Sequence, residues 1–128
     1  MMLQPGSYLQ DRYEILALIG TGGMSEVYQA KCHKLNRLGA IKVLKEEFSQ
    51  DSNFVSKFKM EAQAAAGLSH PNIVSVYDVV DEGDLHYIVM ELIEGITLKS
   101  YILKKGHLGV KETIGIAIQV AQGIAAAH

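Results

Sequence analysis

Residues 20–30 read GTGGMSEVYQA, a stretch in which three glycines fall within four positions and a strand-like run follows. Glycine carries no Cβ, so backbone amides in such a loop can approach the oxygens of a phosphate closely. Gly20 and Gly22 have the spacing of a Gly-x-Gly-x-x-Gly loop, and Ser25 stands where the third glycine would be. The stretch therefore predicts a phosphate-binding loop, and the residues around it decide which kind.

Two of the three common glycine-rich designs do not fit. A Walker loop requires a lysine directly after its last glycine, whereas Met24 follows Gly23 here. A dinucleotide-binding loop, as in an oxidoreductase, runs into a helix and needs an acidic residue about 20 positions later. SEVYQAK (25–31) favours a strand instead, and Lys42 lies where that carboxylate is required. The third design is a hairpin folded over phosphates with a lysine on the next strand, and it agrees with both observations.

The hydrophobic pattern predicts the order β-β-β-α-β-β, followed by two helices. The glycine-rich loop joins the first two strands as one hairpin, and DEGD (81–84) joins the last two as another. The polar segment 46–53 is predicted to be a connection that ends in the capping residues Ser52 and Asn53. The expected strands are 12–20, 26–31, 40–45, 72–80 and 85–92, and the expected helices are 53–68, 97–106 and 110–128.

Two further features concern packing. The centre of strand 85–92 is apolar from Tyr87 to Met90, which is typical of a strand covered on both faces. Gly115 and Gly123 lower the helix propensity of 110–128, which indicates close packing against another element. The change from strands to helices predicts a division into residues 1–93 and 94–128.

One acidic residue, Glu61, falls inside the apolar stripe of helix 53–68. An ionised carboxylate in apolar surroundings is costly unless a cation pairs with it. Glu61 therefore either reaches out to solvent or meets a cation, and Lys42, flanked by apolar strand residues, is the cation we expect. At about 100° per residue, the stripe consists of Phe54, Phe58, Ala62, Ala65 and Leu68.

Together and in this order, the motifs resemble the N-terminal part of a eukaryotic-type protein kinase. They are most similar to the bacterial Ser/Thr kinases that carry the catalytic domain on the cytoplasmic side of a membrane anchor. IGTGGMSEV (19–27) resembles that group's glycine-rich loop, in which the third glycine is often a serine. AIKVL (40–44) resembles the Val-Ala-Ile-Lys strand, with Gly39 in place of the valine. KMEAQAAAGLSHPNIV (59–74) matches the helix glutamate and the following His-Pro-Asn-Ile-Val, and YIVMEL (87–92) matches the strand before the hinge.

The resemblance spans nearly the whole chain and implies an α+β fold. Its first part would be a kinase N-lobe, with a five-stranded antiparallel sheet and the αC helix. The first helices of an α-helical C-lobe would follow after residue 93. The polypeptide would then hold only the beginning of that second lobe.

The same resemblance implies an ATP site. Lys42 would neutralise phosphate charge and Glu61 would hold that lysine, as the two catalytic residues of this part of the chain. The loop over the phosphates would consist of Gly20, Thr21, Gly22, Gly23, Met24 and Ser25. The adenine would be walled by Ile19, Val27, Ala40, Val74 and Met90, with Met90 controlling the back pocket; ordinary core packing is the alternative for these apolar residues. The hinge contacts would be the Glu91 carbonyl and the Ile93 amide.

The resemblance also implies that His-Arg-Asp, a metal-binding Asn and Asp-Phe-Gly follow IAAAH (124–128). These segments orient the substrate hydroxyl and bind Mg²⁺, so no metal ligand is assigned within the chain. We therefore expect a kinase that transfers the γ-phosphate of ATP to Ser/Thr hydroxyls of protein substrates. We expect the 128 residues alone to be inactive. A kinase-like interaction or regulatory module without catalysis is the alternative.

Composition limits the remaining classes. The chain is 48% hydrophobic and 20% charged with a net charge of −2, which fits a globular protein and does not favour nucleic acid or a membrane surface as a partner. The five histidines lack the spacing of metal ligands. The single cysteine, Cys32, fits a reducing compartment.

The N-terminus lacks the pattern of a signal peptide, and the apolar tract 113–127 is shorter than the roughly 18 residues of a membrane span. We therefore expect a cytoplasmic location, with the parent protein anchored to the membrane by a segment outside this chain. We also expect homodimers or larger self-association through the apolar stripe of helix 110–128, because an uncovered stripe favours association.

Overall fold

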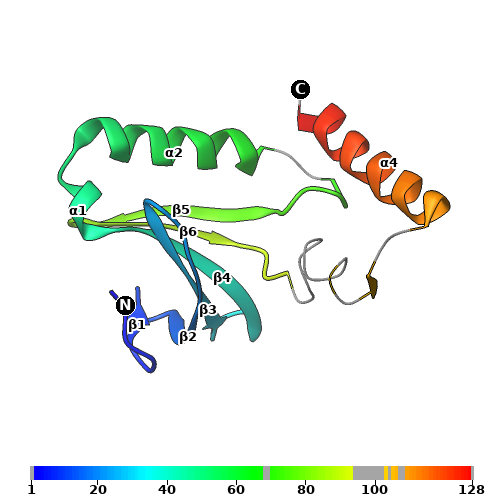
Figure 1. The fold of residues 1–128 in the computed structure, drawn as a ribbon. Coiled ribbons are helices and arrows are strands. Elements are labelled where there is room, and N and C mark those ends of the chain that lie inside the picture. Colours follow the sequence, from blue (N-terminus) through cyan, green and yellow to red (C-terminus); the bar gives the residue numbers. More distant parts are fainter. Residues whose placement is uncertain (1, 68–69, 94–102, 104, 107–108, 128) are drawn as a thin grey trace. The chain divides into compact units, whose positions relative to one another are not determined.

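The computed structural model describes the chain except for residues 1, 68–69, 94–102, 104, 107–108 and 128 (Figure 1). It forms two compact units, Met1–Gly67 with Ser75–Leu92, and Leu68–Val74 with Ile93–His128. The predicted helix 97–106 falls largely outside the described residues. The predicted division at residue 93 stays a prediction.

The first unit is built on a six-stranded antiparallel sheet with the order β1-β2-β3-β4-β6-β5. Five strands correspond to the five predicted ones. The sixth, β1, was not predicted, because a run of two residues is too short to show alternation. The strands are β1 (Tyr8–Leu9), β2 (Tyr13–Thr21), β3 (Ser25–Cys32), β4 (Arg37–Leu44), β5 (Val76–Glu82) and β6 (Leu85–Met90).

Two helices connect β4 to β5. The prediction of a polar connection over 46–53 is wrong in part, because Glu46–Ser49 forms a short helix, α1, with two acidic residues in its first turn. Acidic side chains there interact favourably with the helix dipole. The longer helix α2 (Ser52–Ala66) begins after Asp51, whose side chain accepts a hydrogen bond of 2.9 Å from the Asn53 amide. Asp51 therefore caps the helix, in place of the predicted Ser52 and Asn53.

Hydrophobic residues are buried on both faces of the sheet. Figure 1 shows α2 running along one face, where Phe58 and Ala62 pack with Leu44 and Ile88. A larger cluster that includes Ile41, Tyr87 and Val89 lies on the other face. Neighbouring residues of β6 thus enter opposite clusters, which confirms that this strand is covered on both faces.

The second unit contains α4 (Val110–Ala127), which confirms the last predicted helix. The Asn72 side-chain nitrogen donates to the Gln119 carbonyl at 2.8 Å and to the Gln122 side-chain oxygen at 3.2 Å. A Cβ on Gly123 would lie 2.9 Å from the Asn72 carbonyl oxygen, whereas one on Gly115 would meet no atom of the described residues within 4 Å. Close packing is therefore confirmed for Gly123 and is wrong for Gly115.

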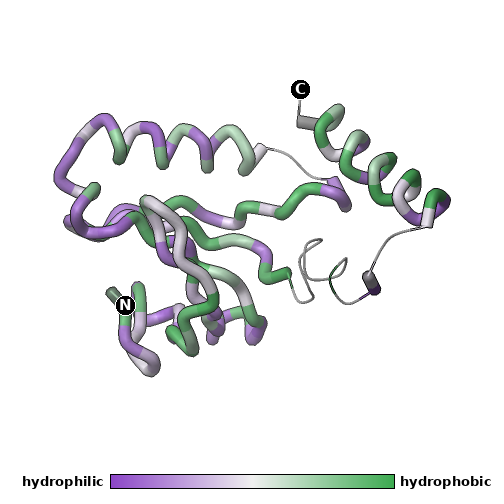
Figure 2. The backbone as a smooth tube through the Cα atoms, viewed as in Figure 1, coloured by the Kyte–Doolittle hydropathy of each residue, from purple (hydrophilic) through white to green (hydrophobic). Residues whose placement is uncertain are grey.

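Hydrophobic residues occur on successive turns of α4 (Figure 2). In the part of the chain that the structure describes, no helix combines the length and the apolar character that crossing a membrane requires.

Candidate functional site

The glycine-rich segment is the turn of a hairpin, as predicted. Thr21 and Glu26 form the last pair of β2 and β3, and the Gly22 amide donates to the Ser25 carbonyl at 2.8 Å to close the turn. Gly20, Gly22 and Gly23 all have φ outside the left-handed region. These glycines therefore contribute by lacking a side chain, which lets a ligand come close to the backbone of the loop.

Lys42 lies on the central strand β4 and is flanked by partners from two strands. It is directly opposite Val27 of β3 and Ile88 of β6, while Ala40 is opposite Met90. Directly paired residues, and residues two apart along a strand, share one face of a sheet. The structure therefore gathers these residues on the face that also packs against α2.

A pocket of about 170 Å³ lies on this face. Three of its lining residues are predicted site residues: Lys42, Glu61 and Met90. The others were not predicted as site residues, because only the strand register and the helix packing reveal that they border Lys42. They are Phe58, Ala62, Ala65, Val76 and Ile88.

The expected ion pair between Lys42 and Glu61 is not formed within the described residues, although both side chains line the same pocket. Glu61 is exposed, while Phe58 and Ala62 of the same helix are buried. Because its carboxylate keeps contact with water, it does not carry the desolvation cost that would demand a cation. Lys42 remains a half-buried cation that no described carboxylate pairs with.

The other predicted residues of the first unit are not among the residues that line this pocket, and they differ in exposure. Ala40 is buried, Val27 is half-buried, and Ile19 is 52% exposed. Glu91 is tied to Ser75, because its amide donates to the Ser75 carbonyl at 2.8 Å and its carboxylate accepts from the Ser75 amide at 3.1 Å. The roles of all these residues in binding adenine stay predictions.

Val74 and Ile93 belong to the second unit, so their part in an adenine site also stays a prediction. Among the described residues, no cluster of three or more His, Cys, Asp or Glu side chains is arranged to hold a metal ion.

Helix α2, which carries Glu61, is tied to the β5–β6 hairpin by a charged cluster. The Lys59 ammonium lies 2.5 Å from Asp81 Oδ2, and His86 Nδ1 lies 2.6 Å from Asp81 Oδ1. The hydrogen bond from Lys59, and then that from His86, lower the pKa of the Asp81 carboxyl. This cluster therefore fixes the helix against the strands that border the pocket.

Comparison with known proteins agrees with this geometry. Residues 13–128 match the family model described as protein kinase domain. Serine/threonine-protein kinase PrkC of Bacillus subtilis is 48% identical over 123 residues, which cover 96% of this chain and 19% of PrkC. Serine/threonine-protein kinase PknB of Mycobacterium tuberculosis is 40% identical over 126 residues, which cover 95% of this chain and 20% of PknB.

The solved kinase domain of Mycobacterium tuberculosis PknI superposes with a TM-score of 0.82 at 28% identity, and the match covers 100% of this chain and 53% of that domain. The chain thus spans about a fifth of the length of the two curated relatives and about half of the solved domain. These matches confirm the resemblance to bacterial Ser/Thr kinases and the N-lobe fold. The chain belongs to the protein kinase family.

Proposed function

We propose that this chain is the ATP-binding part of a serine/threonine protein kinase whose substrates are protein hydroxyl groups. The observation that carries the proposal is Lys42, a half-buried cation on the central strand without a carboxylate partner among the described residues. Partial burial of an unpaired charge is unfavourable, and a phosphate group would supply the missing counter-charge. Glu61 lines the same pocket and is available to orient the lysine.

The hairpin loop supports the same ligand. Gly23 has open space around the position of a Cβ, so a phosphate can approach its amide. Val27 follows on the next strand, directly opposite Lys42, where it can cover a flat base beside the phosphates. ATP with Mg²⁺ would supply the phosphoryl group for transfer; the chain's own residues bind and orient the nucleotide. We propose that the Mg²⁺ ligands belong to segments other than these 128 residues.

A thermal-shift measurement with ATP and with NAD tests the binding proposal. A ligand that binds only the folded state stabilises it, by about 2.7 kcal/mol at a hundredfold excess over Kd. We expect stabilisation by ATP and none by NAD. Lys42→Met should abolish the ATP effect, while Lys34→Met, which changes an exposed lysine in the turn after β3, should retain it. An equal response to NAD, or an undiminished ATP effect in Lys42→Met, would contradict the proposal.

The chain contains neither His-Arg-Asp nor Asp-Phe-Gly. We propose that the 128 residues bind ATP without transferring its phosphate, because the groups that orient the hydroxyl and hold Mg²⁺ are not among them. Sustained phosphorylation of a protein substrate by this polypeptide would contradict the proposal that it does not transfer phosphate. Absence of activity in a longer protein containing these residues would instead favour a regulatory module.

Self-association is a further part of the proposal, supported by α4. Five large apolar side chains of this helix are each more than half exposed: Val110, Ile114, Ile118, Val120 and Ile124. Exposed apolar surface of this kind favours association. Light scattering should show species larger than a monomer, and Ile114→Lys with Ile118→Lys should reduce them. A monomer at high concentration would contradict this part.

We also propose a cytoplasmic location, with membrane anchoring of the parent by another segment. The buried free thiol of Cys32 supports a reducing compartment. If protease added outside intact cells digested the kinase region of the parent protein, this proposal would be contradicted. The absence of nucleic-acid and membrane contacts by these residues stays a prediction.

A further inference from the structure

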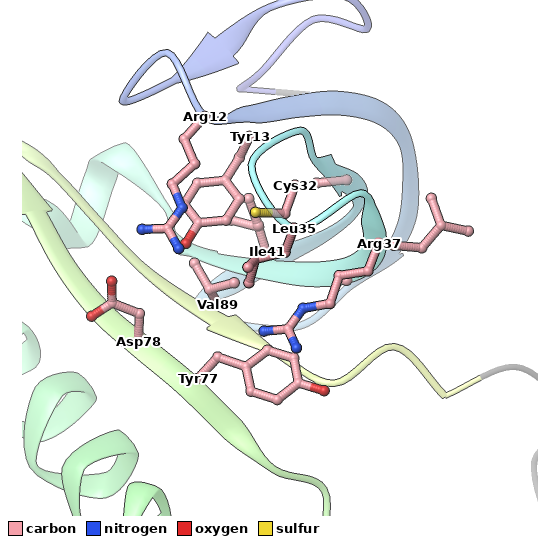
Figure 3. A pocket seen from close by; sticks show the side chains of 12 residues that line it. Arg12, Tyr13, Cys32, Leu35, Arg37, Ile41, Tyr77, Asp78 and Val89 are labelled. Carbon is pink, nitrogen blue, oxygen red and sulfur yellow. The ribbon is translucent and has the colours of Figure 1, made fainter.

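The face of the sheet opposite to Lys42 carries two separate groups of polar side chains. One includes Arg12 and Arg37, at the end of β3 and β4 where Cys32 pairs with Arg37 (Figure 3). The other lies toward the opposite end of the same two strands and is centred on Glu26. This second group therefore lies next to the glycine-rich turn of the proposed phosphate site.

Glu26 is a buried acidic residue behind the glycine-rich hairpin. It is 7% exposed and directly follows Ser25, the last residue of the predicted phosphate loop. Its neighbour Val27 is paired with Lys42, on the face of the proposed ATP site. Glu26 and Tyr28, on either side of Val27, therefore point to the opposite face. A buried carboxylate is costly unless donors surround it, so Glu26 depends on the groups that lie on that face.

Donors to Glu26 come from the N-terminal segment and from Tyr28. The Met2 amide donates to Glu26 Oε1 at 2.8 Å, and the Tyr28 hydroxyl donates to the same oxygen at 2.6 Å. The Leu3 amide in turn donates to the Tyr28 hydroxyl oxygen at 3.0 Å. The hydrogen bond from Tyr28, and then that from Met2, lower the pKa of the Glu26 carboxyl. A continuous hydrogen-bond network therefore ties Met2 and Leu3 to β3.

The N-terminal segment, residues 2–9, also contacts the other strand of the hairpin. The Gly6 amide donates to the Ile15 carbonyl, and the Ile15 amide donates to the Ser7 carbonyl, each at 2.8 Å. The segment ends in β1, which pairs with β2. The side chains of residues 2 and 3 pack against the buried cluster on the face opposite to α2. The segment thus holds both strands of the glycine-rich hairpin, and the network at Glu26 is its attachment nearest to the turn.

We propose that Glu26 is a positioning residue for the phosphates of the nucleotide, because it holds the N-terminal segment against the back of the glycine-rich hairpin. The Lys45 amide, which donates to the Met24 carbonyl at 2.8 Å, ties the same loop to the end of β4. A loop held in this way loses less conformational entropy when a ligand binds, which increases affinity. Glu26 itself does not contact the ligand, since it points away from the face of Lys42. This inference rests on the proposed function.

Titrations with ATP and with adenosine test the proposal, because only ATP carries phosphates to the hairpin. Glu26→Ala should raise the Kd for ATP roughly three- to tenfold and leave the Kd for adenosine within about twofold. Glu26→Gln keeps an oxygen that accepts both hydrogen bonds, and should restore most of the ATP affinity. Glu82→Ala is the matched control, because Glu82 accepts a hydrogen bond of the same length, 2.6 Å, from the Tyr87 hydroxyl in the β5–β6 hairpin. It should leave the Kd for ATP unchanged.

A shortened chain that begins at Gln4 shows whether Glu26 acts through the N-terminal segment. Removal of the first three residues should weaken ATP binding by about the same factor as Glu26→Ala, and the two changes together should weaken it no further. An unchanged Kd for ATP in Glu26→Ala, equal weakening of ATP and adenosine, or additive losses in the combined variant would overturn the proposal. Failure of the unaltered chain to bind ATP, or ATP binding that does not depend on Lys42, would instead overturn the proposed function and this inference with it.

Discussion

Gly123 of α4 faces the backbone of Asn72, and its replacement by alanine sets two opposing effects against each other. The new Cβ would lie 2.9 Å from the Asn72 carbonyl oxygen and 3.4 Å from the Asn72 Cβ. Optimal contacts between non-bonded heavy atoms are about 3.5–4.0 Å. Asn72 cannot withdraw freely, because its side chain donates to Gln119 at 2.8 Å and to Gln122 at 3.2 Å.

The favourable effect is helix propensity, which gives alanine an advantage of about 0.8–1.0 kcal/mol over glycine inside a helix. The unfavourable effect is overpacking, which costs about 1–3 kcal/mol. Gly115 of the same helix provides the matched control, because a Cβ there would lie more than 4 Å from every atom outside its own stretch of helix in the part of the chain that the structure describes. Gly115→Ala should therefore stabilise α4 by about 1 kcal/mol, with no clash to oppose it. The difference between the two variants isolates the clash.

Hydrogen exchange of the α4 amides measures this directly, since the two compact units need not unfold in one step. We expect slower exchange in Gly115→Ala and faster exchange in Gly123→Ala than in the unaltered chain. The opening free energies of the two variants should differ by about 1–3 kcal/mol. Equal stabilisation by both substitutions would refute the close contact between α4 and Asn72.

Two further predictions concern the first unit. Asp81→Asn should remove the tie between α2 and the β5–β6 hairpin, at a cost below about 1 kcal/mol because the Lys59–Asp81 pair is partly exposed. Hydrogen bonds from Lys59 and His86 lower the pKa of the Asp81 carboxyl. The contribution of Asp81 to the free energy of unfolding is therefore complete above the ordinary pKa of an aspartate, and it is lost as the pH falls through the lowered pKa. Urea unfolding should therefore show the loss at neutral pH and not in strong acid; an equal loss in both conditions would contradict the charged tie. Tyr87→Phe should cost about 1–2 kcal/mol in urea unfolding, because the hydroxyl of this fully buried residue donates to Glu82 Oε1 at 2.6 Å; an unchanged midpoint would rule out that hydrogen bond.

Local signals in the sequence were sufficient for most of the fold. The glycines of the first hairpin, the apolar residues that flank Lys42 and the apolar stripe of α2 each arise within a few residues, so pattern and propensity reveal them. The two-residue strand β1 and the four-residue helix α1 are too short to produce such a pattern. They form because β1 pairs with β2 and because α1 packs Phe48 against the buried cluster.

The candidate sites depended more on tertiary structure. The sequence predicted that Lys42 and Glu61 meet, and the structure places both at one pocket but leaves the carboxylate in solvent. In α2, Phe58 is buried against the sheet, while Glu61 lies at the edge of the buried face and is exposed. A helical projection with a fixed angle per residue cannot distinguish these two positions.

The central claim is that the glycine-rich hairpin and Lys42 form one phosphate site. An ATP titration followed by NMR tests it most directly, through the amides of Gly22, Gly23 and Ser25 and the side-chain ammonium of Lys42. We expect these signals to shift together and to saturate at one common Kd, with the amides losing their response in Lys42→Met. Saturable shifts confined to other residues, or hairpin shifts that persist unchanged in Lys42→Met, would contradict the claim.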